Sequence, residues 1–336
     1  MNKTVFVSGA TGFIALHIIK QLIEREYDVV GSVRTDEKGQ DLSRRFGPKF
    51  EYEIVEDIAA EGAFDEAIKK HPEVTTFLHT ASPFTFDIKD ENDLLVPAIN
   101  GTKNALDSII KFGPQINRVV ITSSYVAIFD GRREFKPDAV FTEESWNPIT
   151  YEDAKKHPQL AYWASKKFAE LSAWDIIKEK KPNFSLTTIN PPFVFGPQAF
   201  DSEIRDTLNT SSEIINQILG LQPESKIPKI FSSWIDVRDV AKAHILAFEK
   251  DSAKGKRLLV RSGQFSSFKI VEYLKEIPQI KDALPEPGIG DHEKAIRSLA
   301  TVDNSKTNSI LKLDYINLHD SIIDSAQQIL SVRSKL

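Results

Sequence analysis

The chain has 336 residues, of which 41% are hydrophobic and 27% charged, and its net charge is −5 with seven histidines and no cysteine. This composition is ordinary for a soluble globular protein, and the missing cysteines exclude disulfides, thiol nucleophiles and iron–sulfur clusters and argue against structural zinc. No basic block predicts a nucleic-acid partner and no apolar run approaches the ~18–20 residues of a membrane span, so we expect a soluble, cytoplasmic protein without a bound metal.

The first half of the chain alternates short apolar runs with amphipathic segments. Each apolar run is short enough to be one buried strand, and the runs cover 4–8, 28–33, 50–55, 75–80 and 118–123. Helices are expected between them, among others over 63–70 and 92–111. This strict alternation is typical of βαβ units around a parallel sheet with helices on both faces.

The second half continues the pattern and then departs from it. Residues 160–180 predict a helix, and 185–190 predict a sixth strand. From "PPFVFGP" onward, prolines and aromatic residues replace the regular alternation, and 235–250 predict a helix that returns to the main lobe. We therefore predict an α/β fold: a doubly wound Rossmann sheet of about seven strands from 1–190 and about 231–261, and a smaller mixed substrate lobe from about 191–230 and 262–336.

A glycine turn, "GATGFIA" at 9–15, lies between the first strand and its helix. Gly9 allows a sharp turn, Gly12 allows close approach of the backbone to a pyrophosphate, and the start of the following helix offers free N–H groups to phosphates. Ala15 fills the third small position of the pattern. The context favours a dinucleotide site, and the alternative is a tight turn without a ligand.

The end of the second strand indicates which dinucleotide is bound. An acidic residue there is typical of NAD enzymes, whereas this chain has Arg34, with Lys38 one turn later. Both cations suit the 2′-phosphate of NADP(H), or they form a solvated face. Asp36 falls past the strand end, where it suits a helix cap. Asp57 and its neighbour Ile58 are expected at the adenine edge, unless Asp57 is itself only a cap.

The spacing Tyr-x-x-x-Lys occurs twice, as Tyr151 with Lys155 and as Tyr162 with Lys166. Such a spacing arises by chance in a chain this rich in lysine, so the surroundings must decide between the pairs. Pro158 limits the first pair to a short, charged helix, which predicts solvent-facing side chains. The second pair lies in the first turns of the 160–180 helix, which we expect to direct it toward the carboxyl ends of the strands.

The second pair fits the chemistry of carbonyl reduction. Hydride addition leaves a developing alkoxide that needs a proton, and a phenol with a pKa of ~10 becomes a better acid beside an ammonium group. Lys166 supplies that charge and can also hold the nicotinamide ribose. Ser123 or Ser124, at the end of the fifth strand, offers a hydroxyl to polarise the carbonyl oxygen, unless both only cap the strand.

These residues together resemble the extended short-chain dehydrogenase/reductase family. More narrowly, the chain is similar to the fungal NADPH-dependent ketoreductase and methylglyoxal reductase group, which is related to dihydroflavonol and cinnamoyl-CoA reductases. The resemblance runs essentially end to end. It rests on "VFVSGATGFIA", "LHTASPF", "PAINGTKNAL", "RVVITSSYVAIFD", "ESWNP", "AYWASKKFAE", "NPPFVFGP" and "IDVRDVAKAH".

The resemblance implies a role for individual residues. Ser124, Tyr162 and Lys166 match catalytic positions, and Asn100 matches a proton-relay asparagine, although an asparagine before glycine also suits a turn or cap. Positions that match cofactor contacts are Gly9, Ala10, Thr11, Gly12, Phe13, Ile14, Arg34, Lys38, Asp57, Ile58, Ala81, Tyr162, Lys166, Val194 and Ser211. Positions that match the substrate pocket are Phe84, Tyr125, Phe129 and Phe193. Related enzymes often carry tyrosine at the position of Phe193. The alternative for each of these aromatic residues is that it only fills the core.

The resemblance implies an NADPH-dependent reductase of aldehydes, ketones and α-dicarbonyls that binds a small-molecule carbonyl substrate and works as a monomer or homodimer. One alternative is a nucleotide-sugar epimerase or dehydratase, which typically keeps NAD bound and has an acid after the second strand. Another is a redox sensor that binds NADP without catalysis. Such sensors generally lose the Tyr-Lys pair, which this chain retains.

Overall fold

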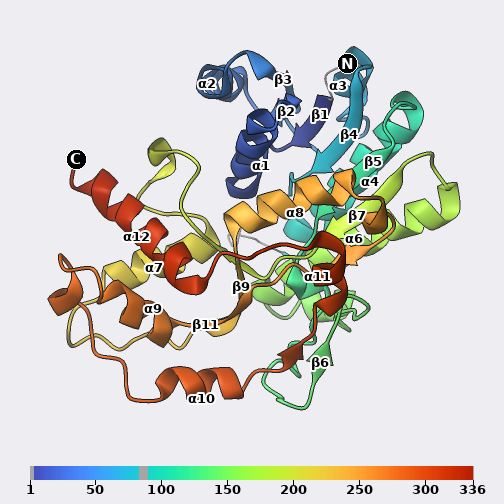
Figure 1. Ribbon diagram of the computed structural model, residues 1–336. Coiled ribbons are helices and arrows are strands. Elements are labelled where there is room, and N and C mark those ends of the chain that lie inside the picture. The colour runs from blue at the N-terminus through green and yellow to red at the C-terminus, as the bar shows by residue number, and fades with distance from the viewer. Residues whose placement is uncertain (1–3, 83–89, 336) are drawn as a thin grey trace.

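A parallel sheet of seven strands forms the centre of the main lobe in the computed structural model, which describes residues 4–82 and 90–335 (Figure 1). Its strand order is β10-β7-β5-β4-β1-β2-β3, and all of its pairings are parallel. The strands are β1 (Thr4–Ser8), β2 (Asp28–Val33), β3 (Phe50–Ile54), β4 (Val74–His79), β5 (Arg118–Thr122), β7 (Ser185–Ile189) and β10 (Arg257–Leu258). The predicted doubly wound sheet is confirmed.

The central strands are apolar because helices cover both faces of the sheet. All five residues of β1 are buried, and Phe6 stacks on Phe77 of β4 with the ring centroids 4.7 Å apart. Val5 and Val7 belong to the core on one face, and Phe6 belongs to the core on the other. A strand buried on both faces has no polar side, which explains the continuous apolar runs of the sequence.

The strand order reverses between β1 and β4. From β1 the chain builds β2 and β3 on one side, and from β4 it builds β5, β7 and β10 on the other. The carboxyl ends of β1 and β4 therefore form the crevice in which open α/β sheets bind ligands. Gly9 follows β1 directly, and Ala81 lies two residues after β4.

Twelve α-helices lie within the described ranges. They are α1 (Phe13–Glu24), α2 (Asp36–Phe46), α3 (Asp65–Lys70), α4 (Asn92–Phe112), α5 (Tyr151–Ala154), α6 (Pro158–Lys180), α7 (Thr210–Leu219), α8 (Val237–Glu249), α9 (Ser267–Leu274), α10 (Asp291–Arg297), α11 (Ser305–Leu311) and α12 (Leu318–Arg333). The 160–180 helix predicted from the sequence is thus α6, which begins two residues earlier because Pro158 occupies its first position. Among the described residues, no helix is long and apolar enough to cross a membrane.

A second, smaller sheet has the order β11-β9-β8, with bounds β8 (Phe193–Phe195), β9 (Phe231–Asp236) and β11 (Gly263–Ser266). A two-stranded sheet joins β6 (Val140–Phe141) to β12 (Thr301–Val302). The helix predicted over 235–250 begins only at Val237, because Ile235 and Asp236 end β9. The structure thus pairs β9 with the small sheet, while α8 packs on α1 of the main lobe and β10 joins the main sheet.

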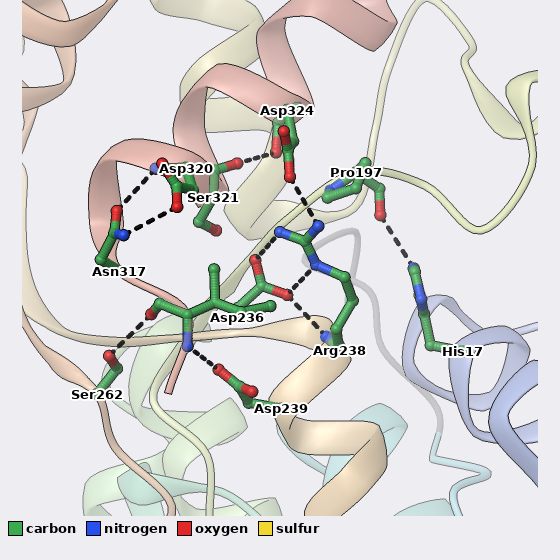
Figure 2. A network of polar contacts seen from close by, with 12 residues as sticks. His17, Pro197, Asp236, Arg238, Asp239, Ser262, Asn317, Asp320, Ser321 and Asp324 are labelled. Carbon is green, nitrogen blue, oxygen red and sulfur yellow. Dashed lines mark hydrogen bonds and ion pairs between the residues drawn. The ribbon is translucent and has the colours of Figure 1, made fainter. Parts of the chain in front are cut away.

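A charged cluster links α8 to the last helix (Figure 2). Asp236 is fully buried and accepts hydrogen bonds from the backbone and guanidinium of Arg238 at 2.8–2.9 Å. The same guanidinium donates to Asp324 of α12 at 2.7 Å. Nearby, burial lowers the pKa of His17 to about 4, so its neutral ring donates from Nε2 to the Pro197 carbonyl at 3.0 Å. The Arg238 contacts join α8 to α12, and the His17 contact joins α1 to the loop after β8.

Candidate active site

The glycine turn lies against the end of β4. Gly9 has φ +67°, and a Cβ there would lie 2.9 Å from the Ala81 Cα, so only glycine fits without strain. Ser32 at the end of β2 holds the turn, because its Oγ and carbonyl accept the N–H groups of Gly9 and Ala10 at 3.0 and 2.9 Å. The predicted cofactor positions at 9, 10 and 81 therefore lie together.

A buried hydroxyl fixes this junction, and the sequence analysis missed it. Ser8 Oγ accepts the N–H groups of Thr80 and Ala81, each at 3.1 Å, and lies 2.9 Å from His79 Nδ1. Burial lowers the pKa of His79 to about 4, so the ring is neutral at pH 7. The motif "LHTASPF" contains this histidine, which is the signal that the sequence offered.

The start of α1 faces solvent. Thr11 and Gly12 are exposed, and Gly12 is an N-cap without a side-chain hydrogen bond. The N–H groups of Phe13 and Ile14 have no intrahelical acceptor at this end, and the helix dipole is positive here. Ala15, one residue on, is buried against the core. An anionic group such as a pyrophosphate fits this end of the helix.

Arg34 and Lys38 are both exposed, and neither pairs with a carboxylate in the part of the chain that the structure describes. Asp36 is engaged elsewhere, because its Oδ1 accepts from the Tyr52 hydroxyl at 2.6 Å. The N-cap of α2 is Thr35 rather than the Asp36 expected from the sequence. Two cations, with no acid directly after β2, suit a 2′-phosphate better than a ribose 2′-hydroxyl.

The loop after β3 is anchored to α4. Ile58 lies against Gly101, where a Cβ would come within 2.7 Å of the Ile58 Cδ1. The exposed Asp57 accepts from the Ala59 N–H at 2.8 Å, so its carboxylate stabilises its own turn. Asn100, which precedes Gly101, lies inside α4 rather than in a turn or cap. The glycine here serves close packing of the loop on the helix.

Ser124, Tyr162 and Lys166 converge beside this crevice. Ser124 follows β5 and its Oγ accepts the Val126 N–H at 3.3 Å, while the Tyr162 hydroxyl is hydrogen-bonded to Ser124. Lys166 lies one turn after Tyr162 on α6, with its Nζ 5.8 Å from the tyrosine ring. The ammonium group donates to Ser82 Oγ at 2.8 Å, a contact that the sequence analysis missed.

Burial sets the electrostatics of this group. It raises the pKa of Tyr162, an effect that the hydrogen bond with Ser124 opposes, and it lowers the pKa of Lys166 to about 8. The hydrogen bond with Ser124 is the lowering effect in this structure, and the lowering by the Lys166 ammonium stays a prediction. A raised pKa keeps Tyr162 protonated at neutral pH, which is the state of a proton donor.

The neighbouring serine and the first Tyr-Lys pair are engaged elsewhere. Ser123 Oγ donates to the buried Glu170 carboxylate at 2.5 Å, so it turns into the core. Tyr151 is 47% exposed and stacks on Phe168 with centroids 4.1 Å apart. Lys155 forms a salt bridge with Glu152 rather than approaching any catalytic group. The solvent-facing position predicted for the first pair is confirmed.

A model of the 3-beta hydroxysteroid dehydrogenase/isomerase family matches residues 6–265, which is most of the chain. The chain belongs to this family.

Fungal reductases are among the proteins that resemble the chain over nearly its whole length. The NADPH-dependent methylglyoxal reductase GRE2 of Saccharomyces cerevisiae is 46% identical over 343 residues, covering 99% of this chain and 100% of that protein. Ketoreductase azaE of Aspergillus niger is 39% identical over 338 residues, covering 98% of each. The crystal structure of Gre2 from Candida albicans in complex with NADPH matches with a TM-score of 0.96 at 48% identity, covering 98% of this chain and 99% of that one. The family resemblance inferred from the motifs is confirmed.

Two of the predicted cofactor positions, Val194 and Ser211, lie in the part of the chain after β7. The N–H of Val194 in β8 donates to the Ser211 Oγ in α7 at 3.1 Å. Val194 is buried in the same core as β1 and α1. The hydrogen bond joins α7 to β8.

The predicted pocket aromatics have different environments. Tyr125 and Phe129 stack with centroids 5.0 Å apart and are 5% and 3% exposed, so most of their surface contacts the core. Phe193 is half-buried and packs against Phe265 at 5.3 Å. Phe84 lies outside the described residues. The contact of these four residues with substrate stays a prediction.

Proposed function

We propose that this chain is an NADPH-dependent carbonyl reductase that converts aldehydes, ketones and α-dicarbonyls to alcohols. The observation that carries the proposal is the convergence of Ser124, Tyr162 and Lys166 beside the glycine turn. Arg34, rather than an acid, directly after β2 supports NADPH over NADH. The methylglyoxal reductase and ketoreductase relatives support the substrate class.

When bound, NADPH supplies the hydride that adds to the carbonyl carbon. The start of α1 holds the pyrophosphate, and Arg34 with Lys38 holds the 2′-phosphate. Ser124 donates a hydrogen bond to the carbonyl oxygen and orients it. Tyr162 then gives its proton to the alkoxide that forms on the substrate. Lys166, as an ammonium, stabilises the resulting phenolate and holds the nicotinamide ribose.

The alternatives fit the site less well. A nucleotide-sugar epimerase or dehydratase of this fold uses an acid on the ribose, and Asp36 is already hydrogen-bonded to Tyr52. A non-catalytic redox sensor does not require the phenol of Tyr162, the ammonium of Lys166 and the hydroxyl of Ser124 to lie around one carbonyl position. Asn100, on α4, completes the proton relay in this proposal. The enzyme works in the cytoplasm as a monomer or homodimer on small molecules, without a nucleic-acid or membrane partner.

Turnover tests the proposal directly. Consumption of NADPH and of NADH is followed by nicotinamide absorbance with methylglyoxal, isovaleraldehyde and uncharged ketones, and we expect turnover with NADPH. Tyr162→Phe should abolish turnover while NADPH still binds, because the change removes only the hydroxyl group that donates the proton. Tyr151→Phe, the same change in the solvent-facing pair, should leave the rate close to that of the wild type. Absence of turnover with every carbonyl contradicts the proposed activity, and an inactive Tyr151→Phe contradicts the assignment of the donor.

A further inference from the structure

A buried carboxylate joins α6 to the strands of the main sheet. Glu170 is 1% exposed, and its two oxygens accept hydrogen bonds from three different segments. Ser123 Oγ donates at 2.5 Å from the end of β5, Asn190 Nδ2 at 2.7 Å from the end of β7, and Arg257 Nε at 2.6 Å from β10. Thr188 of β7 adds a fourth bond at 3.0 Å. Glu170 therefore connects one helix to three neighbouring strands.

Arg257 is held as firmly as its partner. Its guanidinium lies 3.6 Å over the Trp146 ring and donates from Nη1 to the carbonyls of Glu143 and Ser145 at 2.8 and 2.6 Å. A buried ion pair of this kind is often no more stabilising than apolar residues of the same size, because both charges lose their hydration. The fold alone therefore does not explain why a charge pair lies in this position.

The pair is directly connected to the catalytic residues. The Asn190 side chain donates to both the Glu170 carboxylate and the Ser124 carbonyl, at 2.7 and 3.2 Å. On α6, Lys166 and Tyr162 lie four and eight residues before Glu170, which is about one and two helical turns. Glu170 thus links the helix that carries the proton donor to the strand end that carries the serine.

We propose that Glu170, with Asn190 and Arg257, is a positioning residue that holds Ser124 and Tyr162 in the geometry needed for proton transfer. The inference rests on the proposed reductase function. Displacing a catalytic group by about 1 Å can cost about a hundredfold in rate. Tyr162 lies on α6 and Ser124 follows β5. The placement of one relative to the other therefore depends on contacts between the two elements, such as those of Glu170, and not on the backbone of either element alone.

Glu170→Gln tests the inference while keeping the side-chain shape. The amide keeps one acceptor oxygen, whereas the carboxylate accepts from Ser123 and Asn190 on one oxygen and from Arg257 and Thr188 on the other, so the hydrogen bonds on one side are lost. We expect kcat to fall by about tenfold or more, while the Kd for NADPH stays within about twofold of the wild-type value. In alcohol oxidation the pH profile should shift to higher pH, because the hydrogen bond from Ser124 lowers the pKa of Tyr162. A purely structural role lowers the amount of folded enzyme without shifting that profile.

A control variant separates positioning from stability. Ile176→Ala removes buried apolar volume from the same helix and no hydrogen bond to Glu170. It should lower the unfolding temperature and keep kcat and the pH profile. If Glu170→Gln does not fold, Asn190→Ala breaks the connection to Ser124 while retaining the ion pair with Arg257, and should reproduce the kcat loss and the pH shift.

The outcomes distinguish this inference from the proposed function. Wild-type enzyme without carbonyl turnover contradicts the proposed function. An active wild type together with a folded Glu170→Gln or Asn190→Ala variant of unchanged kcat and pH profile overturns the positioning role alone.

Discussion

Replacing Arg34 by alanine tests the choice of cofactor. Arg34 is exposed at the end of β2, and in the described structure it has no carboxylate partner, so no internal contact is lost with it. A charge-assisted hydrogen bond contributes about 1.5–3 kcal/mol, and solvent exposure places Arg34 at the lower end of that range. We therefore expect the Kd for NADPH to rise about tenfold, whereas the Kd for NADH, which lacks the 2′-phosphate, changes by less than about twofold.

Fluorescence titration of the purified protein with each cofactor measures both constants. Arg44→Ala is the matched control, because Arg44 lies on the adjacent α2, is 76% exposed and pairs only with Asp41 among the described residues. It removes the same charge and should change neither Kd. Raising the salt concentration should reduce the difference in the Kd for NADPH between the wild type and Arg34→Ala, since salt screens an exposed charge contact. Equal weakening of NADPH and NADH binding by Arg34→Ala would refute the 2′-phosphate assignment.

Three further predictions concern the turn, the lysine and the core. Gly9→Ala should weaken NADPH binding in the same titration and lower the free energy of unfolding by at least about 1–2 kcal/mol, because φ +67° is costly for alanine and its Cβ meets Ala81. Lys166 has a pKa lowered by burial to about 8 from its ordinary 10.5, so between these pH values the unfolded chain holds a proton that the folded chain has released. The free energy of unfolding of the wild type should therefore rise with pH over that window relative to Lys166→Met, and a constant difference would contradict the lowered pKa. Phe77→Ala should lower the free energy of unfolding by about 3–5 kcal/mol in denaturant titration, because the ring is fully buried and stacked on Phe6; a loss below 1 kcal/mol would contradict that packing.

The main sheet was predictable because each of its central strands is buried on both faces, which leaves an uninterrupted apolar run in the sequence. β9 was missed for the opposite reason. Its residues Ser232 and Ser233 break the apolar pattern, and its partners β8 and β11 are distant in the chain. The predicted helix therefore absorbed Ile235 and Asp236, although the structure ends a strand there.

The candidate site was likewise predictable where local sequence decides the structure, and not where distant partners decide it. Local context was enough to separate Tyr162 from Tyr151, because a short capped helix and a long packed helix differ within a few residues. The buried face of α6 was not predictable in the same way. The apolar residues that recur along this helix include Phe168 and Leu171, which are only half-buried, whereas Ala173 and Glu170 are buried. A buried glutamate depends on partners up to 87 residues away, and no local pattern contains them.

The origin of the catalytic side chains has a consequence for how this protein can diversify. Ser124, Tyr162 and Lys166 come from the end of β5 and from α6, while β8, β9 and β11 form a separate sheet in the later part of the chain. Substitutions or loop insertions between 212 and 230, beyond the predicted cofactor position Ser211 and in the proposed substrate lobe, leave the hydride- and proton-transfer residues unchanged. A directed-evolution library confined to that segment should therefore yield variants that differ in the carbonyl they accept while sharing one cofactor and one chemistry.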